Sequence, residues 1–506
     1  MAKVSEKKMG VLISYFNLFI SMIIPLFYTP IMLNLLGKSE YGLLSVAQSV
    51  IAYLSLMNFG MSTTVIRYLN KYRGENNKNG IKRIIALFII IYLFLAMLIC
   101  IVGFSIPKFS GVIFQKGLTS AEISKLNILI ILLTINVPIG FLTNVFSSVV
   151  LSYEKFTFKY SIDTIGTILA PVLNLIALAN GFASIGIVFV SLIWQILMLI
   201  LFIFYCKIKF DISPDFKHTP FHMTKELFSF SSIIFLSAIA DLLFWSTDKV
   251  LIGATLGTIS VAIYNIGNTF TSMFQNMSAV VSNVFSIEAN KIVFTNQSID
   301  ESSKLLIKVG RIQYLIISLI LSGFIVFGKK FIMFWAGKDY DLSYYIALIT
   351  MIPLTIPMIQ TVAFNTIVAL GKHLFRSKIY ICIAIINVIS TYLILPYYGI
   401  VGAALCTGLA FIIGQGIILN YYYYKEIKLD IVGFWKNIIY MSRVPFFMII
   451  LASIIIKCIS FNGLLELLIG ILLYTFIFVI LTWKYTMNKY EKSIFSGMIK
   501  RFKKQY

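Results

Sequence analysis

Three charged residues lie in one apolar stretch of the sequence, residues 237–257, which reads SAIADLLFWSTDKVLIGATLG. They are Asp241, Asp248 and Lys249. A charge in the hydrocarbon core of a bilayer costs at least about 2.5 kcal/mol, and intramembrane acids commonly mark ion or substrate pathways. We therefore expect Asp241 to bind a coupling proton or cation. The alternative is that its carboxylate pairs with a polar group of another helix.

The other two charges leave two interpretations open. In one continuous helix, Asp248 lies on nearly the same face as Asp241, seven residues earlier, and Lys249 is turned by about 100° from Asp248. The two neighbours are therefore not expected to form a direct ion pair. The sequence leaves undecided whether Asp248 and Lys249 face a cavity or lie at the outer membrane interface.

Other sites of chemistry are not indicated by the sequence. It contains no phosphate-binding loop, no His/Cys cluster and no plausible catalytic triad. His218 and His222 are four residues apart, but Pro220 lies between them and no third metal ligand is near. The five cysteines are scattered without CxxC spacing. We therefore predict no catalytic residues, no metal and no cofactor.

The elements that position these charges are membrane-spanning helices. The chain has 506 residues, of which 59% are hydrophobic and only 12% charged, whereas about 25% of a soluble protein is charged. The length of its apolar blocks is near the ~20 residues that a helix needs to cross a bilayer. This composition predicts an all-α polytopic membrane protein. The predicted spans are the 14 segments 9–35, 41–66, 84–106, 123–151, 160–179, 184–206, 227–253, 257–288, 309–328, 342–369, 378–395, 400–424, 435–457 and 462–483.

The basic residues fix the expected orientation. The termini and the alternate loops on their side of the membrane hold 32 of the 42 Lys+Arg residues, and the opposite side holds 8. Cytoplasmic loops carry such an excess, so both termini are predicted to be cytoplasmic. The net charge of +22 is thereby explained by topology, and no nucleic-acid partner is predicted. Spans 41–66 and 257–288 are rich in Ser, Thr, Asn and Gln, which suits helices that line a wet cavity.

An internal duplication divides the chain. Residues 35–71 align with 255–291 without a gap, and Leu36-Gly37 then meets Leu256-Gly257. Two parallel repeats of six helices follow, a plan in which the substrate site of a transporter lies between the repeats. The sequence thus predicts two lobes around a central cavity plus two extra helices. We expect an N-terminal lobe at 1–215, a C-terminal lobe at 216–432, and helices 13–14 with a basic tail at 433–506.

These motifs resemble those of the polysaccharide-biosynthesis flippases, the Wzx-type O-antigen and capsule exporters of the multidrug/oligosaccharidyl-lipid/polysaccharide (MOP) superfamily. The resemblance covers essentially the whole chain. One departure is Asn34, where many members carry a basic residue, so a substrate contact at that position is not carried over. The residues that carry the resemblance are LGKSEYGL at 36–43, NFG at 58–60, RY at 67–68, DK at 248–249, IG at 252–253 and LG at 256–257.

The resemblance implies a two-lobed transporter of the bacterial cytoplasmic (inner) membrane that works by alternating access. Its substrate would be an undecaprenyl-pyrophosphate-linked oligosaccharide repeat unit, moved to the outer leaflet for polymerisation. The partners would be this lipid-linked oligosaccharide, the lipid bilayer, a coupling cation (H⁺ or Na⁺), and polysaccharide polymerase and assembly proteins. Lys249 and Arg67 are predicted to draw in the anionic substrate, with Asp248 beside them. For Arg67, which lies at the end of its span, the alternative is a role as a simple cytoplasmic anchor.

Four rival functions remain at this point. A multidrug or small-cation exporter of the same superfamily would have a tighter, more acidic and aromatic cavity and usually 12 spans. A lipid II flippase would also have 14 spans but more deep arginines. A membrane glycosyltransferase or polymerase would need a large catalytic loop, and no loop here exceeds about 25 residues. A structural assembly subunit would not need polar helices inside the membrane.

Overall fold

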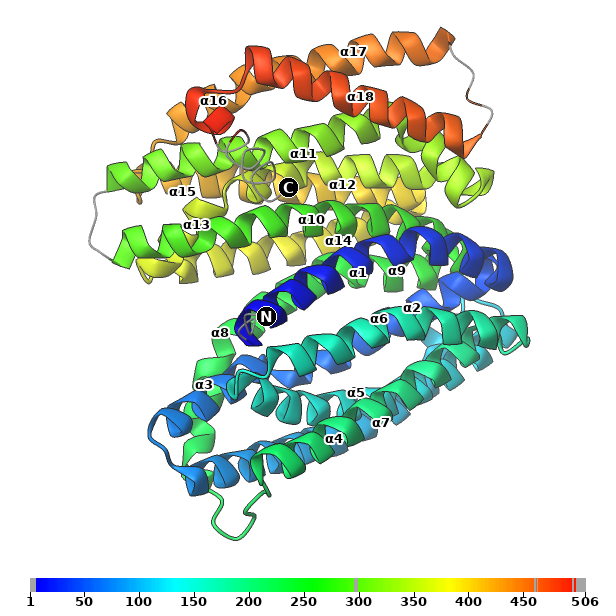
Figure 1. Ribbon diagram of the computed structural model, residues 1–506. Coiled ribbons are helices and arrows are strands. Elements are labelled where there is room, and N and C mark those ends of the chain that lie inside the picture. The colour runs from blue at the N-terminus through cyan, green and yellow to red at the C-terminus, as the bar shows by residue number, and fades with distance from the viewer. Residues whose placement is uncertain (1–5, 295–298, 459–460, 462, 494–495, 497–506) are drawn as a thin grey trace, which may run out of the picture. The chain divides into compact units, whose positions relative to one another are not determined.

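The computed structural model describes residues 6–294, 299–458, 461, 463–493 and 496 (Figure 1). Every regular element in this part of the chain is a helix. Eleven helical stretches of the described residues are long and apolar enough to cross a membrane, so the prediction of a multi-pass, all-α membrane protein is confirmed. The exact number of 14 spans stays a prediction. One 52-residue stretch, Leu374–Lys425, is itself interrupted at Gly399, which has φ 57° and ψ −151°.

The described chain forms two compact units, Met1–Ile263 and Tyr264–Tyr506. In the first unit α5 is central and packs against α2, α3, α4 and α7, while α1 packs along α6. Fully buried residues such as Ile84, Leu129 and Ile130 fill its interior. Its helices are α1 (Glu6–Leu36), α2 (Lys38–Ser55), η1 (Leu56–Asn58), α3 (Met61–Gly74), α4 (Lys78–Ile113), α5 (Ser120–Ser152), α6 (Phe156–Ala179), α7 (Ala183–Phe210), η2 (Phe221–Met223), α8 (Thr224–Trp245), α9 (Thr247–Leu256) and the start of α10 (Thr258–Phe294).

The second unit is built around α11, which contacts α12, α13, α16, α17 and α18. Figure 1 shows α17 and α18, in orange and red, running side by side. Beyond the rest of α10, its helices are α11 (Ile299–Trp335), η3 (Lys338–Tyr340), α12 (Leu342–Ile359), α13 (Thr361–Ala369), α14 (His373–Phe411), the π-helical η4 (Ile412–Ile418), α15 (Leu419–Lys425), α16 (Ile431–Met441), α17 (Arg443–Cys458) and α18 (Leu464–Tyr485).

The boundary between the units lies inside α10 and not at residue 215. Residues 216–263, which the repeat assigns to the C-terminal lobe, belong to the first unit because α8 packs on α3 and α9 packs on α2. Compact units report packing, whereas repeats report sequence similarity. The lobe boundaries drawn from the repeat therefore stay a prediction.

Two predicted spans of the first unit are interrupted. The span predicted at 41–66 bends where Phe59 (φ 49°) and Gly60 (φ 67°) adopt left-handed backbone conformations. The span predicted at 227–253 is divided at Ser246 (φ −109°, ψ −34°) into α8 and α9. Discontinuous helices of this kind are common at the binding sites of transporters.

The aligned glycines Gly37 and Gly257 share one backbone conformation. Gly37 has φ 76° and ψ 165°, and Gly257 has φ 86° and ψ 176°, a region that only glycine occupies without strain. Gly42 packs directly against the backbone of Thr258, the residue after Gly257. A Cβ added to Gly42 would lie 1.8 Å from the carbonyl oxygen of Thr258. The LGKSEYGL motif therefore has a packing role at the start of α2.

Replacing Gly42 with alanine should destabilise the first unit by at least about 3 kcal/mol, the upper range for overpacking, because the contact is with backbone that cannot rotate away. The measurement is the midpoint of thermal unfolding of the purified protein in detergent. Gly74→Ala is the matched control, since nothing lies within 4 Å of its added Cβ. Equal midpoints for the two variants would contradict this packing.

Candidate functional site

The two interrupted spans of the first unit pack against each other. The hydroxyl of Tyr53 on α2 lies 2.6 Å from that of Thr247 on α9, and the hydroxyls of Thr64 on α3 and Ser231 on α8 are 2.8 Å apart. Between these contacts, at the bend of the first span, the ring of Phe59 lies near two phenylalanine rings of α8. The first span is thus held against α8 and α9 by hydrogen bonds on either side of its own bend.

The structure buries Asp248 in the first unit. Its side chain is fully buried in the first turn of α9, and Lys249 beside it is half-buried. The interruption at Ser246 starts a new helix, and the positive end of a helix dipole favours a carboxylate in its first turn. The interruption between α8 and α9 therefore gives a physical reason for an acidic residue at this position. Its role, and that of Lys249, in substrate binding stays a prediction.

Asp241 lies in a different environment from Asp248. It is exposed on α8, 17 residues and about 26 Å along the helix from Thr224. The expectation that Asp241 and Asp248 share a helix face assumed one continuous helix, whereas α8 ends at Trp245 and α9 begins at Thr247, so the shared face stays a prediction. A charge that deep is stable only where water or another polar group reaches it, so the exposed side of Asp241 requires a polar surrounding.

The structure does not bring Arg67 and Lys249 together. Arg67 is exposed on α3, one turn beyond the Thr64–Ser231 contact, and Lys249 follows the Tyr53–Thr247 contact. Ser231 and Thr247 are 16 residues apart, so these two contacts are separated by about 24 Å of helix. A single binding site that includes both cations is therefore not formed within the first unit.

A polar pocket that the sequence reasoning missed lies between α2, α5 and α7 of the first unit. Its volume is about 430 Å³. Asn136 and Gln195 both lie near the middle of their long helices α5 and α7, so the pocket is at the depth of the membrane-spanning segments. Its lining consists of Gln48, Ile51, Ala52, Ser55, Leu133, Asn136, Val137, Gly140, Phe141, Asn144 and Gln195.

Four carboxamides give this pocket its chemistry, and no acidic or basic side chain is among the described residues that line it. Asn136 donates to Ser191 at 3.2 Å and Gln195 donates to Thr143 at 3.1 Å. The Asn136 Oδ1 atom is buried and accepts no hydrogen bond from the described residues. A buried acceptor without a donor is costly, so the hydrogen-bonding capacity of Asn136 is not fully used within the described part of the chain.

The sequence indicated part of this pocket. The polar composition of the span predicted at 41–66 indicated a wet surface, and Gln48 and Ser55 do line the pocket. The amides of α5 and α7 stand alone within apolar runs such as LLTINVPIGFLTN at 132–144. An amide in the middle of an apolar span could have been identified as a candidate contact, because it costs free energy there.

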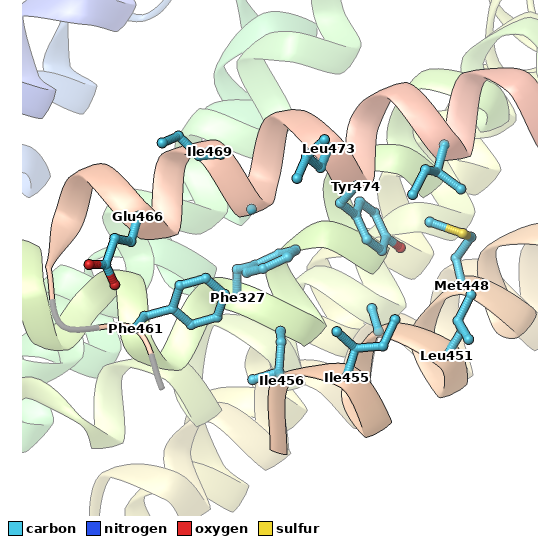
Figure 2. Close-up of a pocket in the computed structure, with 13 residues that line it drawn as sticks. Phe327, Met448, Leu451, Ile455, Ile456, Phe461, Glu466, Ile469, Leu473 and Tyr474 are labelled. Carbon is cyan, nitrogen blue, oxygen red and sulfur yellow. The ribbon is translucent and has the colours of Figure 1, made fainter. Parts of the chain in front are cut away.

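A second pocket, in the other unit, is apolar. It lies between α11, α17 and α18, and its volume is about 460 Å³. Figure 2 shows Glu466 and Phe461 at one end and Met448 and Leu451 at the other, with Phe327 and Tyr474 between them. Several of the lining side chains are exposed, among them Ile469 and Leu473. A hydrocarbon chain is the ligand that suits such a lining.

The fold is that of known membrane transporters. The chain is similar to a structure described as lipid II flippase MurJ in an inward closed conformation, with a TM-score of 0.68, 17% sequence identity, and coverage of 94% of this chain and 99% of that chain. It is also similar to an inward-facing multidrug resistance MATE family transporter of the MOP superfamily, with a TM-score of 0.62, 14% identity, and coverage of 84% and 99%. At these identities the likeness shows the fold.

The sequence comparison identifies the family. Residues 8–285 match the model of the polysaccharide biosynthesis protein family, and the chain belongs to this family. A curated relative from Shigella flexneri, named "Putative O-antigen transporter", is 22% identical over 397 residues, which cover 77% of this chain and 90% of the relative. The family resemblance inferred from the motifs is thereby confirmed.

Proposed function

We propose that this protein is a flippase that moves an undecaprenyl-pyrophosphate-linked oligosaccharide repeat unit from the cytoplasmic to the outer leaflet for cell-surface polysaccharide synthesis. It works by alternating access in the bacterial cytoplasmic membrane, with both termini cytoplasmic. Membership in the polysaccharide biosynthesis protein family and the name of the Shigella flexneri relative support the substrate class. The polymerase and the assembly proteins of the same polysaccharide are its expected partners.

The carboxamide pocket of the first unit is the observation that carries this proposal. Sugars present many hydroxyl groups, and Asn and Gln side chains both donate and accept hydrogen bonds. Phe141 adds an apolar surface for the sugar ring in the same pocket. The pocket lies at the depth of the membrane-spanning segments, and there it offers the repeat unit hydrogen bonds that replace those made to water. The apolar pocket of α11, α17 and α18 holds part of the prenyl chain.

The charged residues act on the rest of the substrate and on the driving force. Asp241 binds the coupling proton or Na⁺. Lys249, with Asp248 beside it, and Arg67 attract the pyrophosphate at different points of its path, because the contacts next to them are separated by about 24 Å of helix. A multidrug or cation exporter is less well supported, because no carboxylate is among the described residues that line the polar pocket. The lipid II flippase remains a rival that an experiment must separate.

Replacing both Asn136 and Asn144 with leucine should slow flipping of a sugar-bearing substrate at least about tenfold, because each lost hydrogen bond is worth about 1 kcal/mol. The purified protein is reconstituted in vesicles with a labelled prenyl-pyrophosphate oligosaccharide. Appearance of the sugar on the outer surface is followed with a reagent that does not cross the membrane.

Asn180→Leu is the control, because this amide lies at the end of α6, is exposed and bonds only its own helix among the described contacts. Absence of flipping by the wild type would overturn the proposal, as would equal rates for all variants. Lipid II and a lipophilic cation are added as competitors. Stronger inhibition by either than by an unlabelled oligosaccharide lipid would favour the corresponding rival.

A further inference from the structure

A basic pocket lies at the end of α18 in the second unit and shares no lining residue with either pocket described above. It has a volume of about 330 Å³. Three elements meet there: α11, α16 and the chain that follows α18. The side chains used in the argument are Lys304, Lys308, Arg311, Asn437, Tyr490 and Glu491.

A buried ion pair fixes one wall of this pocket. The Nε atom of Arg311 lies 2.6 Å from Oε1 of Glu491, and Nη2 lies 3.1 Å from Oε2. The two side chains are 7% and 1% exposed. Arg311 also donates to Asn437 Oδ1 at 3.0 Å and to the Thr486 carbonyl at 2.9 Å. The wall is therefore rigid, and the charge of its one acidic lining residue is matched by Arg311.

Two further lysines leave the pocket positively charged. Lys304 and Lys308 are four residues apart, so they lie on the same face of α11 as Arg311. The Nζ atom of Lys308 is 4.4 Å from the centre of the Tyr490 ring, which places its ammonium group at the pocket. Three basic residues and one acidic residue thus line it. Basic pockets between membrane helices on the cytoplasmic side bind lipid phosphates.

The position along the chain puts this pocket at the level of lipid headgroups. The last candidate span ends at Tyr485, and Glu491 is only six residues further on. Trp483, Tyr485 and Tyr490 surround this point in the sequence, and such residues are enriched at the membrane–water interface. We propose that the pocket binds the phosphate of an anionic phospholipid headgroup, on the same side of the membrane as the C-terminus.

The test is native mass spectrometry of the full chain in detergent with phosphatidylglycerol, and with phosphatidylcholine as the zwitterionic lipid. Lys304→Gln with Lys308→Gln should weaken binding of phosphatidylglycerol about 30-fold at this site, as expected for two lysines near an anionic surface. Binding of phosphatidylcholine should not change. Lys329→Gln with Lys330→Gln is the matched control, because these two lysines lie near the other end of the same helix.

Equal binding of phosphatidylglycerol to the wild type and the Lys304/Lys308 variant would overturn the proposal. So would an equal loss in both double variants, since the effect would then reflect total charge and not this pocket. Displacement of the lipid by millimolar inorganic phosphate would overturn the assignment to a lipid. None of these measurements uses flipping activity, so failure here is distinct from failure of the proposed function.

Discussion

Replacing Glu491 with alanine should release the chain after α18 from the second unit. The substitution leaves the Arg311 guanidinium buried without its carboxylate partner, and removing one member of a buried ion pair typically costs about 3–5 kcal/mol. It also removes the hydrogen bond from the Asn488 backbone N–H to Glu491 Oε2, at 2.9 Å. This segment lies at the end of the described chain, so we expect it to detach locally and hydrate Arg311, without unfolding the whole unit.

Hydrogen exchange measures this release directly. An opening that is easier by 3 kcal/mol exchanges backbone amides about 150-fold faster, so the amides of residues 486–491 should lose most of their protection. Arg311→Met should have the same effect, because it leaves the Glu491 carboxylate buried. The double variant Arg311→Met with Glu491→Met should recover much of the protection, since an apolar pair can replace a buried ion pair.

Lys489→Ala is the matched control for this experiment. Lys489 is exposed and lies two residues before Glu491, so its loss should leave the exchange of residues 486–491 nearly unchanged. If Glu491→Ala exchanges as slowly as Lys489→Ala, the ion pair does not hold the segment. If the double variant exchanges faster than either single variant, the two side chains are not coupled in the way the structure shows.

The sequence predicted the helical spans well because each of them is a local property. A run of about 20 apolar residues must form a helix in a bilayer, since its backbone polar groups have no other partners there. The interruptions were not predicted. Around Ser246 and Phe59 the sequence mixes apolar and polar residues in blocks, and distant contacts such as that of Tyr53 with Thr247, 194 residues away in the chain, are not indicated by either stretch.

Arg311 shows the same limit for charged residues. The sequence places it among the basic residues between two spans, where it contributes to the topology signal. In the structure it is buried in α11 and paired with Glu491, 180 residues later. No local pattern indicates such a partner. The carboxamide pocket is likewise assembled from α2, α5 and α7, so its single amides become a site only through packing.

Replacing Asp241 with asparagine should remove the dependence of transport on an ion gradient. If one coupling cation moves with each substrate, a membrane potential of 100 mV supplies about 2.3 kcal/mol, which is equivalent to a ratio of about 50 in substrate distribution between the leaflets. Asparagine has nearly the same shape but takes up no proton and carries no charge for Na⁺. The variant should therefore equilibrate the labelled lipid between leaflets but not accumulate it.

The measurement compares the final distribution of the labelled oligosaccharide lipid in vesicles with and without an imposed potential, and with pH and Na⁺ gradients imposed separately. Asp163→Asn is the matched control, because Asp163 lies in α6 and already pairs with Lys159 four residues earlier. Accumulation by Asp241→Asn equal to that of the wild type would exclude Asp241 as the coupling residue. If the variant loses flipping as well as accumulation, Asp241 belongs to the transport path itself, because a residue that only couples the ion is dispensable for equilibration.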